Sequence, residues 1–519
     1  MLDLGNMTHS LPRTSFALCR MALLTCALTA GSNCVAQRTD GKLVLRVVDE
    51  QTKVPIAVRL ELRDARDRLV RINPPESVVA ADGVYFTGET TLALRRGNYT
   101  LMLEAGPEYQ TFFTQPGTLE IVRGADDAKD VAMMRRVDMR REGWYAGDLD
   151  VRLPAEGLAT VMAARGVDVA PVAVAVNELG RCRRPKTAAG AAAPTTVRYE
   201  GRGGGLLLVG GDTLPDVCDV PADGSLLAPL AAARKAGAAI VAMRADAWAL
   251  PVWIASGKLD AVQIMSAEGS PTRRGNRTAT ATESSRPRDL TLFPGKTGPG
   301  RYAESIYHRL LDCGLRIVPA AGTGAGDGGE MSLGANRVYV RCGDDVTPAD
   351  WLAGLRAGHV TVTNGPLLRT SVDGRPPGHL FEQPTDGTRE YEVALNLAFY
   401  AQTHIEYLEI VKDGRVIHNV RLDELAGQGG RLPKVPFDAS GWFAVRAVTS
   451  DLERRQFATS GAYFVQAGEQ PRISRESVEF FRTWLDELAA KFVDDAAVQA
   501  DVAAARPFWD DLRARANVD

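Results

Sequence analysis

VDVAPVAVAV, residues 167–176, is the first of five short apolar runs that decide the fold class of this 519-residue chain. The other four are GLLLVGG (205–211), AAIVAM (238–243), LDAVQIM (259–265) and LRIVPAAG (315–322). Continuous apolar runs of this length are typical of parallel strands that are buried on both faces. Helical patterns lie between several of them, and SLLAPLAAARKAG (225–237) and YAESIYHRLLDCG (302–314) both end at a glycine, the usual left-handed helix stop. Strands that alternate with helices predict an α/β barrel or a layered sheet.

On both sides of this region, apolar residues recur at every second position. KLVLRVVD (42–49) and the segment from Tyr391 to Phe399 show this pattern, which predicts half-buried strands. After Ser474 the apolar period becomes helical. We therefore predict a multi-domain α/β plus β protein. Its parts are a signal peptide at 1–36, a β-sandwich at 37–137 that resembles carboxypeptidase-regulatory-like domains, a central α/β barrel domain at 138–370, a second small β-sandwich at 371–468 and a helical tail at 469–519.

The N-terminus has the order of a secretory signal. Arg13 and Arg20 precede an apolar stretch, and small residues follow up to Ala36. We expect cleavage near Ala36–Gln37 and a secreted or periplasmic mature protein. No later segment is apolar over the roughly 20 residues that a transmembrane helix needs, so no transmembrane anchor is expected.

The cysteines and the net charge indicate which thiols could pair and which partners the protein could bind. Cys182 and Cys218 flank a loop-rich region and could pair, whereas Cys313 and Cys342 lie in apolar stretches that suggest core thiols. Lys plus Arg number 61 and Asp plus Glu number 64, which gives a formal net charge of -3. Because nucleic-acid-binding proteins usually carry a basic excess, no nucleic-acid partner is expected.

GWYAGDLDVR, residues 143–152, opens the central region and carries a family resemblance. Further motifs are WALPVWIASG (248–257), YHRLLDCGLRIVPAAGTGAG (307–326), LGANRVYV (333–340) and WLAGLRAGHVTVTNGPLL (351–368). As a set, they resemble the CehA/McbA-like (carbaryl hydrolase-like) metallohydrolases of the polymerase-and-histidinol-phosphatase (PHP)-like superfamily. The resemblance implies a central PHP-like barrel and a divalent-metal site for hydrolysis.

The chain departs from the family pattern where metal should bind. The two histidines of the family's His-x-His pair fall on Asp150 and Arg152. Arginine cannot ligate a metal and repels a cation. Thr323 lies where a superfamily Asp would end a late strand, and no histidine lies between Arg38 and Tyr307. We therefore expect no cofactor. If the protein is active, Mg or Mn is favoured over Zn, because the remaining ligands are carboxylates.

Polar residues near the predicted strand ends are the candidates for a site. Asp148, Asp150 and Glu268 are candidate catalytic groups, and together with Asp246 they would be the ligands of any metal. Asp148 could instead cap a turn or pair with an arginine. We expect Arg152 at the barrel mouth, within salt-bridge reach of one of these carboxylates. The predicted pocket further includes Arg244, Asp246, Thr323, Asn336, Arg337 and Asn364, and the turn-forming role is preferred for Asn364.

Three functional hypotheses remain open from the sequence. The first is a catalytically inactive descendant of the hydrolases that binds an unknown small molecule or envelope component, or serves as a scaffold. The second is an active hydrolase of esters or phosphoesters with a carboxylate-rich Mg or Mn site. In the third, the two β-sandwiches contact glycans or envelope proteins and the barrel is a spacer. Fold resemblance alone cannot choose among them.

Overall fold

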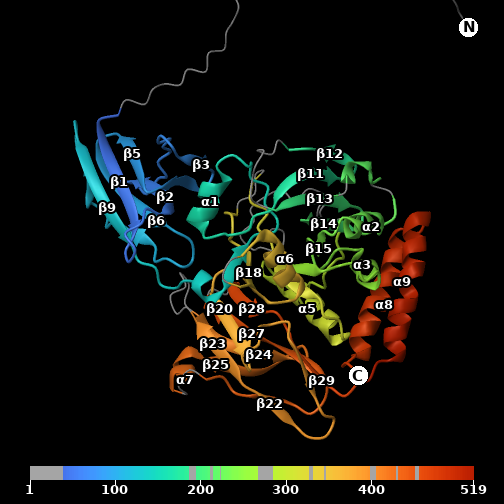
Figure 1. Cartoon of the computed structure of the whole chain (residues 1–519). Coiled ribbons are helices and arrows are strands. Elements are labelled where there is room, and N and C mark those ends of the chain that lie inside the picture. Colours follow the sequence, from blue (N-terminus) through green and yellow to red (C-terminus); the bar gives the residue numbers. More distant parts are fainter. Residues whose placement is uncertain are drawn as a thin grey trace, which may run out of the picture. The chain divides into compact units, whose positions relative to one another are not determined.

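The computed structural model describes residues 39–519 except 186–193, 211–213, 215, 222–223, 267–283, 327–330, 344–345, 398–404, 428–430 and 451–454. In this part of the chain, the protein is a mixed α/β, sheet-rich, multi-domain protein in which strands outnumber helices (Figure 1). The predicted signal peptide and Glu268 lie outside the described residues. None of the described helices is both long and apolar enough to cross a bilayer.

Two sheets form the first region because alternate side chains of their strands are apolar. One has the order β5 (Glu89–Leu94), β1 (Gly41–Asp49), β9 (Asp126–Met133). The other has the order β3 (Val78–Ala80), β4 (Gly83–Thr87), β2 (Ala57–Asp64), β6 (Gly97–Glu104), β7 (Phe112–Phe113), with β8 (Leu119–Ile121) also paired to β6. Leu45, Phe86 and Leu103 belong to one core that both sheets share. The region is therefore built as a sandwich.

The central apolar runs become strands of one sheet. Its described strands have the order β12 (Arg181–Arg183), β11 (Val172–Glu178), β13 (Thr195–Gly201), β14 (Gly204–Val209), β15 (Ala239–Ala242), β16 (Ala261–Met265), β17 (Val318–Ala321). The helices of this region are α1 (Leu158–Arg165), α2 (Ala228–Lys235), α3 (Leu250–Ala255), α5 (Gly298–Asp312) and α6 (Pro348–Arg356), with short 3-10 turns η1 (Arg140–Glu142) and η2 (Val217–Asp219). The pairs β15–β16 and β16–β17 are parallel, as the runs predict, and β11 is also parallel to β13, a strand outside the five runs.

Strand β14 corrects one of these predictions, because it is antiparallel to both β13 and β15. Only Arg202 and Gly203 separate β13 from β14, whereas a parallel connection needs a crossover of a dozen or more residues. The run is apolar throughout because all six residues of β14 are buried. Burial on both faces, rather than strand direction, is what the pattern reports.

A short segment joins the two sides of the central sheet. It continues β10 (Trp144–Gly147) as far as Arg152. On one side, Gly147 bridges Val169 in parallel just before β11. On the other, Val151 bridges Ala325 beyond β17, and the Arg152 backbone N–H donates to the Ala325 carbonyl at 2.7 Å. Single bridges therefore join the segment 147–152 to the chain on both sides of this sheet.

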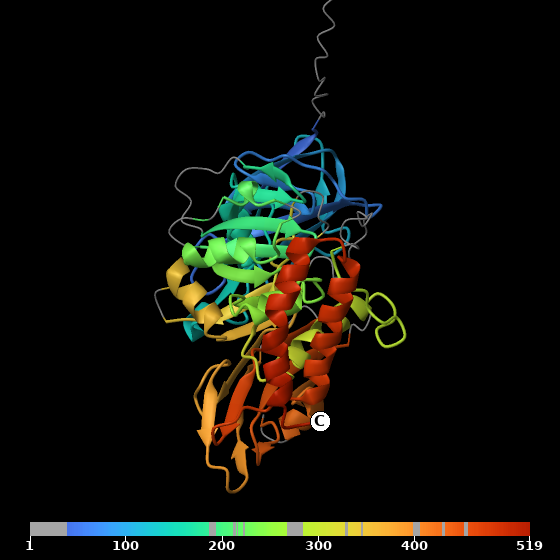
Figure 2. The same cartoon turned by 90° about the vertical axis from the view of Figure 1, so that its right-hand side faces the viewer.

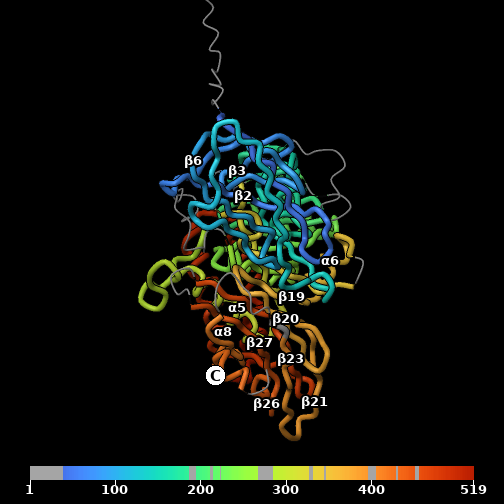
Figure 3. The backbone as a smooth tube through the Cα atoms, turned by 90° about the vertical axis from the view of Figure 1, so that its left-hand side faces the viewer, coloured from blue at the N-terminus to red at the C-terminus, as the bar shows by residue number. Residues whose placement is uncertain are grey.

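The nine-stranded sheet links the central and C-terminal regions. Its main order is β10, β18 (Arg337–Arg341), β19 (Val360–Thr363), β28 (Phe457–Ser460), β27 (Gly441–Thr449), β24 (Ile405–Lys412), β25 (Arg415–Arg421), and β29 (Tyr463–Ala467) joins β27 to β21 (Leu380–Gln383). Strand β19 pairs antiparallel with β28, Thr361 opposite Ser460. Main-chain pairing thus crosses the predicted boundary at 370/371, and in Figure 3 the labels of β19 and β27, the two strands that flank β28 in this sheet, lie one below the other.

Two small ladders and a short helix complete the C-terminal region. The ladders are β20 (Leu368–Val372) with β23 (Val393–Leu397) and β22 (Arg389–Tyr391) with β26 (Val435–Phe437), and the helix is α7 (Leu422–Gly427). Tyr391, Phe437 and Phe443 lie in the core that these strands share with the large sheet.

Helices α8 (Arg475–Lys491) and α9 (Ala496–Ala514) form the described C-terminal end and lie side by side (Figure 2). The apolar stripe predicted for the tail is buried on α8, where Val478, Phe481 and Leu485 are at most 1 % exposed. Trp509 of α9 donates its indole N–H to the Pro251 carbonyl of α3 at 3.1 Å. The two helices therefore pack on the central region through this apolar stripe.

Candidate functional site

Asp148 is the first polar residue after β10, and it is fully buried. One carboxylate oxygen accepts the backbone N–H of Thr323 at 2.9 Å, and the other accepts that of Gly334 at 2.9 Å. Burial raises the pKa of Asp148 to about 6, although these hydrogen bonds act in the opposite direction. Because both oxygens hold backbone amides, Asp148 fixes the loop after β17, which is the capping role that the sequence leaves open.

Asp150 and Arg152 form an ion pair at the same end of the sheet. A terminal guanidinium nitrogen of Arg152 lies 3.2 Å from the Asp150 carboxylate. This is the salt bridge predicted for Arg152. A second guanidinium, that of Arg198 on β13, lies 3.5 Å from the other oxygen of Asp150 and also pairs with Glu200.

Arg198 is a site residue that the sequence analysis missed. Its side chain is 5 % exposed, and its Nε has no hydrogen-bond partner among the described residues. Burial alone would lower the pKa of Arg198, but Asp150 and Glu200 raise it above its usual value, so the guanidinium stays charged. The available signal was the charged pair Arg198 and Glu200, two positions apart inside an otherwise β-forming run.

These groups line a cavity of about 430 Å³. Its wall is largely apolar, with Leu149, Val172 and Leu207 among the lining residues. Three guanidiniums, those of Arg152, Arg183 and Arg198, line it together with the carboxylate of Asp150. An apolar wall with a few charged groups at one place is the usual composition of a small-molecule site.

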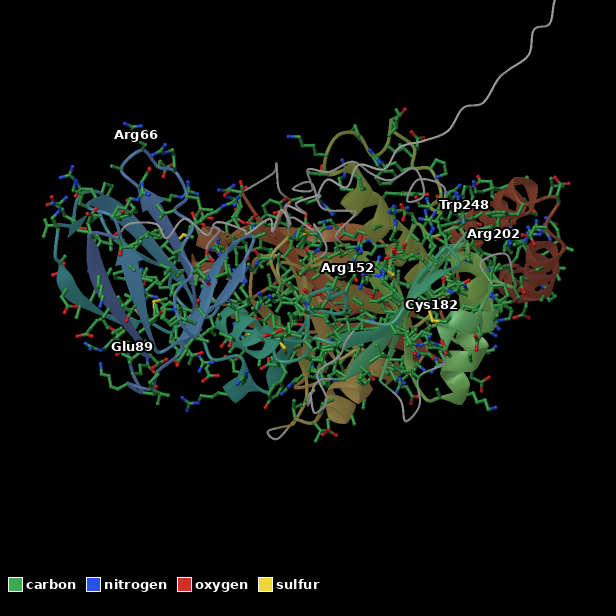
Figure 4. All side chains as sticks on the ribbon, turned by 90° about the horizontal axis from the view of Figure 1, so that it is seen from above. Arg66, Glu89, Arg152, Cys182, Arg202 and Trp248 are labelled. Atoms are coloured by element: carbon green, nitrogen blue, oxygen red, sulfur yellow. A yellow bond between two sulfur atoms is a disulfide. The ribbon has the colours of Figure 1, made fainter. Side chains whose placement is uncertain are left out.

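A disulfide borders this cavity. Cys182 of β12 is bonded to Cys218 of η2, with 5.3 Å between their Cα atoms. Figure 4 labels Cys182 and Arg152, and a sulfur–sulfur bond is drawn at Cys182. The bond fixes the strand that carries Arg183 and settles the pairing that the sequence leaves open. The two remaining cysteines in the described chain, Cys313 and Cys342, are free.

The cavity is not lined by Thr323, Asn336 or Arg337, three residues of the predicted pocket. Their side chains instead hold the neighbouring backbone. The Thr323 hydroxyl donates to the Asn336 carbonyl at 3.0 Å, and the Asn336 side chain donates to the Gly322 carbonyl at 3.1 Å. Arg337 donates to the carbonyls of Arg165 and Gly166 at 3.2 Å, where it satisfies the C-terminal end of α1.

Asn364 has the turn-fixing role that the sequence favours. Its side-chain oxygen accepts the Phe457 N–H at 2.8 Å, and its amide donates to the Arg455 carbonyl at 3.3 Å. It therefore holds the turn after β19 against the strand β28.

Arg244 and Asp246 form a bidentate ion pair, with two contacts of 2.7 Å. Neither is among the described residues that line the cavity at Asp150. Glu268, the fourth predicted carboxylate, lies outside the described residues. The structure therefore joins Asp150 and Arg152 but does not place Asp246 in the same cavity wall.

The donor set at this end of the sheet does not fit a divalent metal. The oxygens of Asp148 hold backbone N–H groups, and those of Asp150 face two guanidiniums. In the described part of the chain, no three His, Cys, Asp or Glu side chains group as metal ligands would. A cation beside Asp150 would meet the positive charges of Arg152 and Arg198.

Comparison with known proteins does not identify a family. No family model and no curated protein matches the chain. One solved structure, a pilus-presented adhesin, is similar over 18% of this chain and 27% of its own, at 12% identity and a TM-score of 0.14. The chain therefore spans about a quarter of that adhesin, and the likeness carries no argument.

Proposed function

We propose that the protein is an exported, non-catalytic relative of the PHP-like metallohydrolases, with a PHP-like barrel in its central region, and that it binds a small anionic molecule in the cavity at Arg152. The observation that carries the proposal is the position of two guanidiniums on Asp150. Arg152 contacts it at 3.2 Å and Arg198 at 3.5 Å. The positive charges of these arginines lie where a hydrolytic metal ion would need to bind, and they already neutralise the carboxylate of Asp150.

The cavity supports an anion with an apolar body as the ligand class. Asp150 is the single carboxylate among the described lining residues, against three guanidiniums. The buried Nε of Arg198 has no hydrogen-bond acceptor in the described chain. A buried donor without an acceptor lowers the stability of the fold by about 1–3 kcal/mol. A ligand carboxylate would accept from such a donor, while the wall around Leu149 and Leu207 would bury an aliphatic or aromatic group.

Two features support an extracytoplasmic location in this proposal. The predicted secretory signal precedes the described residues, and the bond between Cys182 and Cys218 is of the kind that persists in oxidising compartments. We expect the exported form to begin near Gln37, which mass spectrometry of a periplasmic or culture fraction would measure. Retention of Met1 in that fraction would contradict the proposal of a cleaved signal.

The ligand proposal is tested by calorimetric titration of the full chain with benzoate as a probe that has one carboxylate and one apolar ring. Arg152→Gln should weaken binding about tenfold, because a charge-assisted hydrogen bond contributes roughly 1.5–3 kcal/mol. Arg66→Gln is the matched control, since Arg66 is an exposed arginine in the first region (Figure 4). Equal binding by Arg152→Gln and wild type would overturn the proposed site.

The non-catalytic proposal is tested by hydrolysis of aryl ester and aryl phosphate substrates with and without added Mn²⁺ or Mg²⁺. We expect no turnover above background. Metal-dependent turnover that Asp148→Ala abolishes would instead establish the carboxylate-rich hydrolase.

A further inference from the structure

A second cavity, of about 460 Å³, is lined by residues from the start of β10, the end of β18 and the ladder of β20 and β23. Three arginines line it, Arg141 from η1, Arg341 from β18 and Arg369 from β20. Among the described lining residues, Glu142 is the one carboxylate. The three guanidiniums come from segments that are far apart in the sequence, so the fold is what gathers them.

Arg369 is the buried member of this group. Its side chain is 7 % exposed. Nε and one terminal nitrogen donate to the two oxygens of Glu142, each at 2.9 Å. The remaining terminal nitrogen, Nη1, is buried and has no hydrogen-bond partner within the described chain. The bidentate contact with Glu142 uses one edge of the guanidinium, which leaves Nη1 on the opposite edge.

The charges in the wall are unbalanced. Glu142 neutralises Arg369, while no ion pair joins Arg141 or Arg341 to a carboxylate in the described chain. Arg341 is partly buried. Burial is the larger cause of the lowered pKa of His359, and the positive charge of Arg341 lowers that pKa further. Two guanidiniums facing one cavity repel each other unless an anion lies between them.

Short polar groups and close backbone packing complete the wall. Ser371 and Thr370 of β20 line it, and so does Gly143, whose backbone has a φ of 76°. A Cβ at Gly143 would lie 2.9 Å from the Cys342 carbonyl oxygen. Glycine at this position therefore lets η1 turn into β10 while Arg141 and Glu142 stay at the cavity.

We propose that this cavity is a second anion site, separate from the one at Arg152, and that it binds a dianionic oxyanion of the phosphate class. A dianion matches the two guanidinium charges that Glu142 leaves uncompensated. Its oxygens would accept from Arg369 Nη1 and from Arg341, because guanidinium donors fit phosphate geometry. The polar wall distinguishes it from the largely apolar cavity at Asp150.

Inorganic phosphate is the probe, titrated into the full chain by calorimetry at low and at moderate NaCl. We expect binding that weakens as NaCl rises. Arg341→Gln should raise the dissociation constant about tenfold or more, and Arg316→Gln, which changes an exposed arginine outside this cavity, should leave it within twofold. Equal affinities in Arg341→Gln and wild type, or no binding at millimolar phosphate, would overturn the proposal.

Glu142→Gln provides a test that damage to the fold would not imitate. Removing this carboxylate abolishes its repulsion of the anion, so phosphate should bind more tightly, about threefold or more. Arg152→Gln should leave phosphate affinity unchanged, and that result separates this site from the one at Asp150. Weaker phosphate binding in Glu142→Gln, with thermal unfolding unchanged, would count against the proposed charge arrangement.

Discussion

Glu304→Gln should be among the most destabilising single substitutions in the α5 helix. Glu304 is 7 % exposed, and its two oxygens contact Arg446 of β27, at 2.6 Å, and Arg455. Although burial alone would raise the pKa of Glu304, Arg446 and Arg455 together hold it below its usual range. The carboxylate is therefore charged in the folded protein and links a helix of the central region to the C-terminal sheet.

The magnitude follows from what the substitution leaves behind. Removing one partner from a buried ion pair costs about 3–5 kcal/mol, because the other charge stays buried without compensation. Arg446 keeps Glu409 as a partner, whereas no other carboxylate pairs with Arg455 in the described chain. The glutamine also retains one acceptor oxygen. We therefore expect a loss at the lower end of that range, about 3 kcal/mol.

Urea unfolding followed by tryptophan fluorescence measures this loss, provided that the m value is unchanged. Trp442 lies close by, with its ring 5.2 Å from that of His308. The matched control is Glu406→Gln, which removes a carboxylate from a more exposed pair with Arg421 at 3.7 Å and should cost less than about 1 kcal/mol. A loss below about 1 kcal/mol for Glu304→Gln would refute the reasoning about buried charge.

Three further predictions concern pH and the disulfide. Burial lowers the pKa of His308 to about 4, so the unfolded chain binds the proton more tightly than the folded protein. The stability of wild type relative to His308→Gln should therefore rise from pH 4 to about pH 6.5. Asp148 has the opposite effect, because burial raises its pKa to about 6 and the folded protein therefore binds the proton more tightly. The stability of wild type relative to Asp148→Asn should fall from about pH 4 to pH 6. A relative stability that rises over this range, measured by urea unfolding, would contradict the burial argument. Replacing Cys182 and Cys218 by alanine removes a link across 36 residues and should cost up to about 4 kcal/mol relative to oxidised wild type, measured by thermal unfolding, with reduced wild type as the control. Equal melting temperatures for oxidised wild type and the double variant would exclude a stabilising link.

Local patterns predicted local structure well. The dipeptide Asp413–Gly414, a common hairpin-turn sequence, has both residues at positive φ and joins the antiparallel strands β24 and β25. Gly314 follows α5 with a φ of 76°, the left-handed stop that the sequence indicates. These features depend on a few adjacent residues, whose backbone preferences act wherever the segment lies in the fold.

Longer-range features were not predictable in the same way. The direction of β14 follows from a two-residue connection, while its apolar run reports only burial. In the pairing of β19 with β28, Thr361 lies opposite Ser460, and no sequence feature of either strand identifies the other as its partner. Strand partners are chosen by tertiary packing, which a single sequence does not display.

The candidate site shows both outcomes. The ion pair of Arg152 with Asp150 could be predicted, because the two opposite charges lie two positions apart in the short segment that follows β10. Arg198 comes from another strand and completes the group only after folding. Arg369 likewise meets Glu142 across more than two hundred residues, so its cavity has no local motif.

The pairing of β19 with β28 also determines how this chain can be divided. Truncation at residue 370 would remove β28 from one side of β19 and leave a row of unpaired N–H and C=O groups along buried, apolar Val360 and Val362. A bare strand edge of this kind recruits other chains and drives aggregation. A piece of the chain that ends at residue 370 is therefore expected to aggregate unless its exposed sheet edge is first covered or redesigned.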